Sequence, residues 1–131
     1  MPENPTASTP PEGRLGHQMM IEYYECDHAV LTDIHELERV FLEAARLSGA
    51  HVVGSHFHLF QPQGISGVVV ISESHFAVHA WPEYDYAAVD IFTCGDTIDF
   101  QTAETALRRG LASKRHIVVG EFDRGLIARK A

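Results

Sequence analysis

Residues 67–93 read GVVVISESHFAVHAWPEYDYAAVDIFT, three strand patterns in immediate succession. Residues 67–72 are almost entirely apolar, which predicts a central strand buried on both faces. Residues 75–81 alternate, with the histidines on one face and Phe76, Val78 and Ala80 on the other. Residues 86–93 form a third strand pattern. The connections are too short for a crossover, so these strands must pair antiparallel.

Patterns on either side complete the expected fold, in the order β-α-β-β-β-β-α-β. Two helices cover only one face of such a sheet. We therefore expect an α+β two-layer sandwich, an antiparallel sheet with two helices on one face. The open face needs a cover, and packing of sheet on sheet across a homodimer would provide it. The further elements are strands over residues 19–24, 51–60 and 115–122, a turn over 61–64, and helices over 32–48 and 102–112.

The first helix carries the clearest helix signals. Asp33 followed by Glu36 resembles a capping box, and Gly49 is placed to end the helix. One apolar stripe at helical spacing marks its buried side. The stripe consists of Ile34, Leu37, Val40, Phe41, Ala44 and Ala45.

Composition sets the limits of domain organisation and location. Residues 1–13 hold four of the six prolines and predict a disordered tail, followed by a single domain over residues 14–131. We see no apolar run long enough to span a membrane and no signal-peptide pattern, and therefore expect a cytoplasmic protein without membrane partners. Cys26 and Cys94 are far apart, which indicates free thiols in a reducing compartment.

The net charge of the chain limits which binding partners we expect. The formal net charge is −8, from 10 basic and 18 acidic residues. Binding to phosphate backbones needs a basic surface, so nucleic acid is not the expected partner. An acidic field attracts cationic small molecules, although solubility alone is an equally good reason for it.

The most reactive side chains gather in residues 73–95. They are Ser74, His75, His79, Glu83, Asp85 and Cys94. Taken alone, Ser74 is a turn serine. A conventional hydrolase is disfavoured because there is no G-x-S-x-G elbow.

Zinc is a weaker alternative for the histidines. His56 and His58 share a strand face, and His51 and His75 are also available. There is no H-E-x-x-H motif and no tight Cys/His set, so we expect no metal site.

Longer motifs reveal a resemblance. The chain resembles the bacterial and archaeal S-adenosylmethionine decarboxylase proenzymes, a pyruvoyl-dependent family, over nearly everything after the tail. The matching segments are Leu15-Gly16, residues 22–27 (EYYECD), 64–75 (GISGVVVISESH), His79, 81–84 (WPEY), 86–90 (YAAVD) and 92–95 (FTCG).

The resemblance implies a chain that cuts itself between Glu73 and Ser74. The Ser74 hydroxyl would attack the carbonyl of Glu73, and elimination and hydrolysis would leave a pyruvoyl group at position 74. A decarboxylase needs an electron sink, and no ordinary side chain has a carbonyl that forms a Schiff base with a substrate amine. A pyruvoyl group supplies that carbonyl.

The resemblance also implies roles for individual residues. His79 supports processing, and Ser66 helps to hold the scissile carbonyl. Cys94 returns a proton to the substrate α-carbon. Phe60 stacks on adenine, and Glu83 holds the ribose hydroxyls. For each residue the alternative is an ordinary packing or surface role.

Two positions depart from the family pattern. Asp85 occupies a glycine position, and Gln18 occupies the histidine position of a Gly-x-His motif. In an extended segment Asp85 and Glu83 would point to one face, where a guanidinium or ammonium group would suit the pair. The alternative is a tolerated substitution in a loop, because aspartate readily adopts turn conformations that glycine allows.

Three hypotheses for the function follow. The first is decarboxylation of S-adenosylmethionine for spermidine synthesis. The second is the same machinery diverted to L-arginine or L-ornithine, giving agmatine or putrescine, with Asp85 as a substrate-binding residue. The third is a non-catalytic binding or regulatory subunit, which would not be cleaved.

Overall fold

The structure, a computed structural model, describes residues 13–126. The tail predicted over residues 1–13 therefore lies outside the described residues, apart from Gly13. No helix in the described part is long and apolar enough to cross a membrane.

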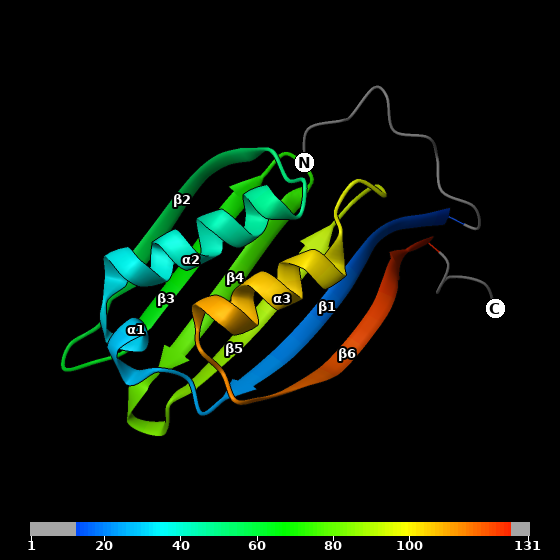
Figure 1. The fold of residues 1–131 in the computed structure, drawn as a ribbon. Coiled ribbons are helices and arrows are strands. Elements are labelled where there is room, and N and C mark those ends of the chain that lie inside the picture. The colour runs from blue at the N-terminus through cyan, green and yellow to red at the C-terminus, as the bar shows by residue number, and fades with distance from the viewer. Residues whose placement is uncertain (1–12, 127–131) are drawn as a thin grey trace.

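Within residues 13–126, six antiparallel strands form one sheet in the order β2-β3-β4-β5-β1-β6. The two long helices, α2 and α3, lie side by side on one face of it (Figure 1). This confirms the predicted α+β sandwich. The strands are β1 (Arg14–Tyr24), β2 (Val52–Leu59), β3 (Ile65–Ile71), β4 (Ser74–Trp81), β5 (Tyr86–Thr93) and β6 (Arg115–Gly125). The helices are α1 (His28–Thr32), α2 (Ile34–Leu47), α3 (Phe100–Gly110) and the short 3-10 helix η2 (Pro82–Tyr84).

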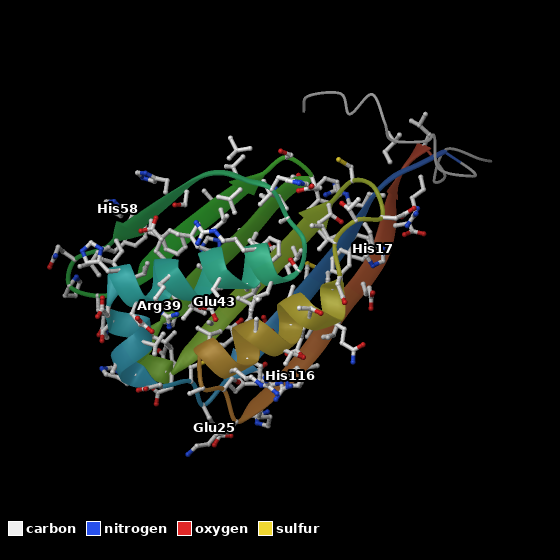
Figure 2. The ribbon with its side chains drawn as sticks, turned by 45° about the horizontal axis from the view of Figure 1, so that its top comes forward. His17, Glu25, Arg39, Glu43, His58 and His116 are labelled. Atoms are coloured by element: carbon white, nitrogen blue, oxygen red, sulfur yellow. The ribbon has the colours of Figure 1, made fainter. Side chains whose placement is uncertain are left out.

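The helix predicted over residues 32–48 begins two residues later, after a separate short helix. Asp33 adopts an extended conformation between them, and its carboxylate accepts hydrogen bonds from the N–H groups of His35 and Glu36. Only half of the predicted capping box forms, because the Glu36 carboxylate instead binds Arg39, at 2.6 Å from Nη2. Arg39 also reaches Glu43 at 3.1 Å on the outer surface of α2 (Figure 2).

Strands β1 and β6 are longer than their sequence patterns predict. Polar residues such as Arg14 and His17 interrupt the alternation at the start of β1. These residues are nevertheless paired, since His17 lies opposite Asp123 in the ladder between the two strands. Cross-strand pairing, which a local pattern does not show, extends both strands.

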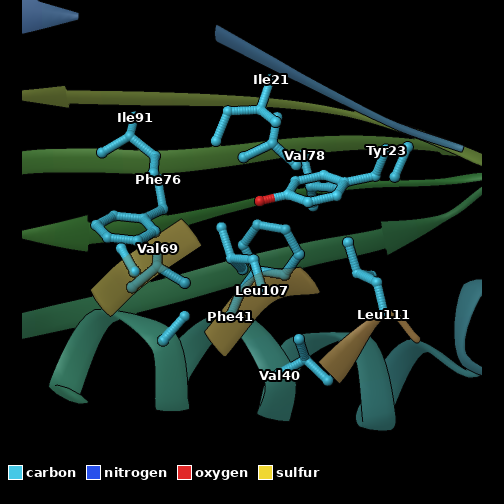
Figure 3. Packing of buried hydrophobic residues seen from close by; sticks show 14 of the residues in the cluster. Ile21, Tyr23, Val40, Phe41, Val69, Phe76, Val78, Ile91, Leu107 and Leu111 are labelled. Atoms are coloured by element: carbon cyan, nitrogen blue, oxygen red, sulfur yellow. The ribbon is translucent and has the colours of Figure 1, made fainter. Parts of the chain in front are cut away.

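The hydrophobic core lies between the sheet and the two long helices (Figure 3). Ile21, Tyr23 and Phe76 from the sheet are fully buried, as are Phe41 of α2 and Leu107 of α3. Burial of side chains of this size contributes roughly 1.5–3 kcal/mol each. The core fixes β3, β4 and β5 as a rigid support for the residues on their other face.

The prediction that β3 is buried on both faces is wrong for the single chain. Only the helix side of this strand is covered. Val69 is fully buried there, whereas Val70 on the opposite face is 43% exposed. Both helices pack on the same side of the sheet, so the other face of this apolar strand stays open. We call the side without helices the open face.

Candidate active site

Ser74 begins β4 directly after the tight turn that joins it to β3. Ile71 pairs with Ser74, so Ser72 and Glu73 alone make the turn. Ser74 has a φ of 149°, a region that residues with a side chain rarely adopt. Such a conformation costs on the order of 1–3 kcal/mol and persists only where the surroundings enforce it. The peptide bond between Glu73 and Ser74 therefore lies in a strained turn.

The carbonyl of Glu73 is held by Cys94. Ser74 pairs with Thr93 across β4 and β5, which places the next residue, Cys94, beside the turn. The Cys94 N–H donates to the Glu73 carbonyl oxygen at 2.8 Å, and its Sγ lies 3.2 Å from the same oxygen. Two donors on one carbonyl polarise it and would stabilise negative charge on its oxygen during an attack. The pairing of β4 with β5 thus places Cys94 beside the bond between Glu73 and Ser74.

A mostly apolar hollow opens next to Ser74 on the open face. Its volume is about 400 Å³. The His75 ring extends along the serine, with Nδ1 at 3.3 Å from Ser74 Oγ. The hollow is lined by Val68, Val70, Ile71, Ser72, Ser74, His75 and Ala77. A small organic molecule could therefore approach Ser74 from this side.

Ser66 and His79 form a separate pair. They lie opposite each other on β3 and β4, and Ser66 Oγ is 3.0 Å from His79 Nδ1. His79 is five residues from Ser74 on the same strand, a separation of about 16 Å at the usual rise per residue. One chain thus does not bring the predicted processing residues Ser66 and His79 to the scissile bond.

The predicted substrate-binding residues lie at the Ser66–His79 end of the sheet. Phe60 follows β2, is 47% exposed and meets His58 edge to face at 4.6 Å between ring centroids. Glu83 is exposed on η2, directly after the end of β4. The candidate residues therefore form two groups, one toward each end of the central strands. We call Glu73, Ser74 and Cys94 the cleavage cluster, and Phe60, Ser66, His79 and Glu83 the distal cluster.

Asp85 does not have the geometry that its spacing suggested. The segment is a 3-10 turn rather than an extended strand, so the premise that Glu83 and Asp85 point to one face is incorrect. Asp85 has a φ of 49°, a left-handed conformation that glycine adopts freely and aspartate tolerates. Its carboxylate lies 3.3 Å from His28 Nδ1, which is also 3.1 Å from the Pro82 carbonyl oxygen.

Gln18, the other departure from the family pattern, lies on β1. Its side-chain oxygen accepts a hydrogen bond from Arg124 of β6 at 2.9 Å. Its contact is therefore with an edge strand, and not with Ser74 or Cys94.

An aromatic row crosses the open face at the distal end, and sequence reasoning missed it. Trp81 stacks on Tyr86 at 5.3 Å, and Tyr86 on Tyr24 at 5.5 Å. The Arg115 guanidinium lies 4.3 Å from the centre of the Tyr24 ring. The alternation of side chains along a strand predicts which face each ring lies on. The alignment of the rings into a row depends on how the four strands pair, which the sequence does not show.

Among residues 13–126 there is no group of three or more His, Cys, Asp or Glu side chains placed to hold a metal ion. The histidines named as zinc candidates, His51, His56, His58 and His75, do not meet in such a site.

Comparison with known proteins identifies close relatives. Residues 17–125 match the family model described as S-adenosylmethionine decarboxylase. The chain is 52% identical to an S-adenosylmethionine decarboxylase proenzyme of Pseudomonas paraeruginosa, over 86% of this chain and 69% of that protein. It is 50% identical to the proenzyme of the same name from Thermotoga maritima, over 85% of each chain. The crystal structure of the adenosylmethionine decarboxylase from Aquifex aeolicus superposes with a TM-score of 0.79 at 28% identity, covering 91% of this chain and 98% of that one.

Proposed function

The chain belongs to the S-adenosylmethionine decarboxylase family, and we propose that it is a proenzyme that cleaves itself and then decarboxylates S-adenosylmethionine for spermidine synthesis. It is a carboxy-lyase of the pyruvoyl-dependent kind. The observation that carries the proposal is the cleavage cluster. The Glu73 carbonyl is held by two Cys94 groups directly before a serine with a φ of 149°.

The first step converts an amide to an ester. Ser74 Oγ attacks the Glu73 carbonyl carbon, and the Cys94 N–H donates to the oxygen as it becomes negative. The bond between that carbon and the Ser74 nitrogen then breaks. The hydroxyl proton passes to the nitrogen, which becomes a free amine. Release of the strained turn conformation favours this step.

The second step breaks the chain. A base removes the Ser74 α-proton, and the Cβ–Oγ bond breaks. Glu73 departs as a carboxylate and leaves dehydroalanine at position 74. Its imine tautomer takes up water and loses ammonia, which leaves the pyruvoyl carbonyl. The two products span residues 1–73 and 74–131.

The surroundings of residue 74 suit a pyruvoyl group. Ser74 lines the hollow of about 400 Å³, whose walls are largely apolar, so a pyruvoyl group formed at this position would be open to a small substrate. Once formed, it supplies a carbonyl that accepts electrons from the bond to the departing carboxylate. Cys94, whose thiol already lies beside position 74, would return a proton to the substrate α-carbon. Phe60 would stack on adenine, and Glu83 would bind the ribose hydroxyls.

A homodimer would unite the two clusters. Ser66 and His79 lie far along the sheet from Ser74 in one chain. A two-fold axis through the open face would bring the distal cluster of one copy onto the cleavage cluster of the other. The exposed apolar side chains of this face support such packing, because sheets stack through apolar faces. They include Val70, Trp81, Ile117 and Phe122.

S-adenosylmethionine is the substrate that the relationship supports. The arginine and ornithine hypotheses rested on Glu83 and Asp85 pointing to one face of an extended segment, and that segment is instead a 3-10 turn. The hypothesis of a non-catalytic subunit does not explain why Ser74 is strained and its preceding carbonyl polarised.

The test begins with the intact mass of the purified protein. We expect a 73-residue chain and a 58-residue chain, the latter without a free amino terminus. Ser74→Ala should remain a single chain. The processed protein should release carbon dioxide from S-adenosylmethionine and not from arginine or ornithine. A wild-type chain that stays at 131 residues would contradict the proposal.

A further inference from the structure

Glu73, the residue on the departing side of the scissile bond, has a buried carboxylate. The side chain is only 9% exposed, unusual for a charged residue in a tight turn. A buried carboxylate is costly unless it is hydrogen-bonded. Its position therefore depends on the groups that bind it.

Those groups belong to His51, which lies just before β2. The His51 main-chain N–H donates to Glu73 Oε1 at 3.2 Å. The ring Nδ1 lies 2.9 Å from Oε2, and it must carry the proton because an ionised carboxylate only accepts. Burial disfavours the charged form of Glu73, but these hydrogen bonds outweigh it and lower the pKa of the carboxyl group.

His51 also holds the other residue of the turn. Its carbonyl oxygen accepts the N–H of Ser72 at 2.8 Å. Cys94 holds the Glu73 carbonyl from β5. The turn is thus fixed from two sides, through its carboxylate by His51 and through its scissile carbonyl by Cys94.

We propose that His51 is a positioning residue for self-cleavage, and that it acts through the Glu73 carboxylate to keep the scissile carbonyl on the Cys94 N–H and Sγ. The inference rests on the proposed function. His51 takes no part in bond making. It restricts rotation of Glu73, so that the carbonyl carbon stays within reach of Ser74 Oγ while the oxygen stays on its donors.

The His51 ring is 79% exposed on its solvent side, so its removal should leave the fold intact. We expect His51→Ala to slow the appearance of the 58-residue chain about five- to tenfold, since it deletes one hydrogen bond from a side chain that is largely exposed to water. The main-chain hydrogen bond remains. His35→Ala changes an exposed histidine of α2 and should cleave at the wild-type rate.

Two amide variants separate the effect of a correctly placed hydrogen-bond donor from the effect of side-chain size at position 51. The asparagine amide nitrogen takes the place of Nδ1, so His51→Asn should recover most of the rate. The glutamine amide reaches the Nε2 position instead, so His51→Gln should stay slow. Equal rates for the two would overturn the proposal even if His51→Ala failed to fold.

A double-mutant cycle tests the route through Glu73. If His51 acts only on that carboxylate, adding His51→Ala to Glu73→Ala should cause no further slowing. Full additivity, or a wild-type rate for folded His51→Ala, would overturn the inference and leave the proposed function standing. A wild-type chain that never cleaves would instead contradict the proposed function itself.

Discussion

Gly67 of β3 lies directly under the ring of Phe57, its partner on β2. A Cβ added at Gly67 would lie 2.2 Å from Phe57 Cδ2, whereas one at Gly54 would meet nothing within 4 Å. Phe57 packs against Phe41 of α2, with the ring centroids 6.2 Å apart. We expect Gly67→Ala to destabilise the protein by about 1–3 kcal/mol because the ring must be displaced. Urea denaturation measures this change.

Gly54→Ala is the matched control on the neighbouring strand. It adds the same methyl group to a β-strand glycine without a clash, and we expect its stability to remain within about 0.5 kcal/mol of wild type. Equal losses for the two variants would show that the close contact with Phe57 is not what requires glycine at position 67.

Asp85 allows a prediction about backbone conformation. At a φ of 49°, alanine pays a steric cost that glycine does not. We expect Asp85→Ala to be about 1 kcal/mol less stable than Asp85→Gly in thermal or urea unfolding. Both variants lose the contact to His28 equally, so the comparison isolates the backbone. Equal stabilities would contradict a conformational role for this position.

Glycine at position 85 also tests specificity. We expect Asp85→Gly to keep a preference for S-adenosylmethionine over arginine and ornithine, because the turn is not the extended segment that would pair Asp85 with Glu83. Carbon dioxide release from the three amino acids measures this preference. A gain of activity on arginine or ornithine would implicate Asp85 in choosing the substrate.

At the scale of elements, His17 links the edge strand β6 to the sheet. Its Nδ1 lies 2.9 Å from Asp123 and its Nε2 3.0 Å from Glu121. Arg14 also lies 3.5 Å from Asp123, and the rings of His17 and Phe100 meet edge to face. Partial burial opposes the charged imidazolium, but the two carboxylates outweigh it and raise the pKa of His17. The hydrogen bond from His17 also lowers the pKa of Asp123.

These shifts set a pH window for stability. A raised histidine pKa gives stabilisation that is complete below the ordinary value of 6.5 and is lost as the pH rises through the raised value. The lowered Asp123 pKa gives stabilisation above the ordinary value of 3.8 that is lost as the pH falls. We expect wild type to exceed His17→Gln in urea resistance at pH 5.5 and the difference to close by pH 9. His35→Gln, on the surface of α2, should show no such trend.

The sequence predicted most elements because local signals and tertiary packing agree. The alternation of β4 placed Phe76 and Val78 toward the helices, where both are buried. Prediction from the sequence failed where contacts with distant parts of the chain determine the local structure. The early part of β1 is polar and is a strand only because β5 and β6 pair with it. The split at Asp33 was missed because one aspartate ends α1 and caps α2.

At the scale of the whole molecule, the sequence named candidate residues for the site but did not predict how the fold arranges them. The resemblance identified Ser74, His79 and Cys94 as candidates. Their spacing in the sequence does not predict that β5 places Cys94 against the Glu73 carbonyl. His51 was considered only as a metal ligand, and its contact with Glu73 was not predicted because the two residues lie 22 positions apart in sequence. The strain at Ser74 was invisible, since serine is common in ordinary turns.

The distance between the clusters leads to a prediction about mixed dimers. Ser74→Ala cannot be cleaved, and we expect His79→Ala to be cleaved at least tenfold more slowly than wild type, in keeping with the usual contribution of a general base. If the His79 that serves each Ser74 comes from the second copy, co-expression of the two variants should restore cleavage. In a mixed dimer, the His79→Ala chain offers its Ser74 to the intact His79 of its partner.

Distinguishable tags on the two chains make the outcome unambiguous. Only the His79→Ala chain should yield a 58-residue fragment, and at most one of the two sites in each mixed dimer can form. A site contained within one chain predicts no cleavage beyond that of His79→Ala alone. A charged residue at the open face, as in Val70→Glu, should prevent the rescue by blocking association, while Leu47→Glu on the exposed surface of α2 should not. Rescue that survives Val70→Glu would mean that the two chains do not meet through this face.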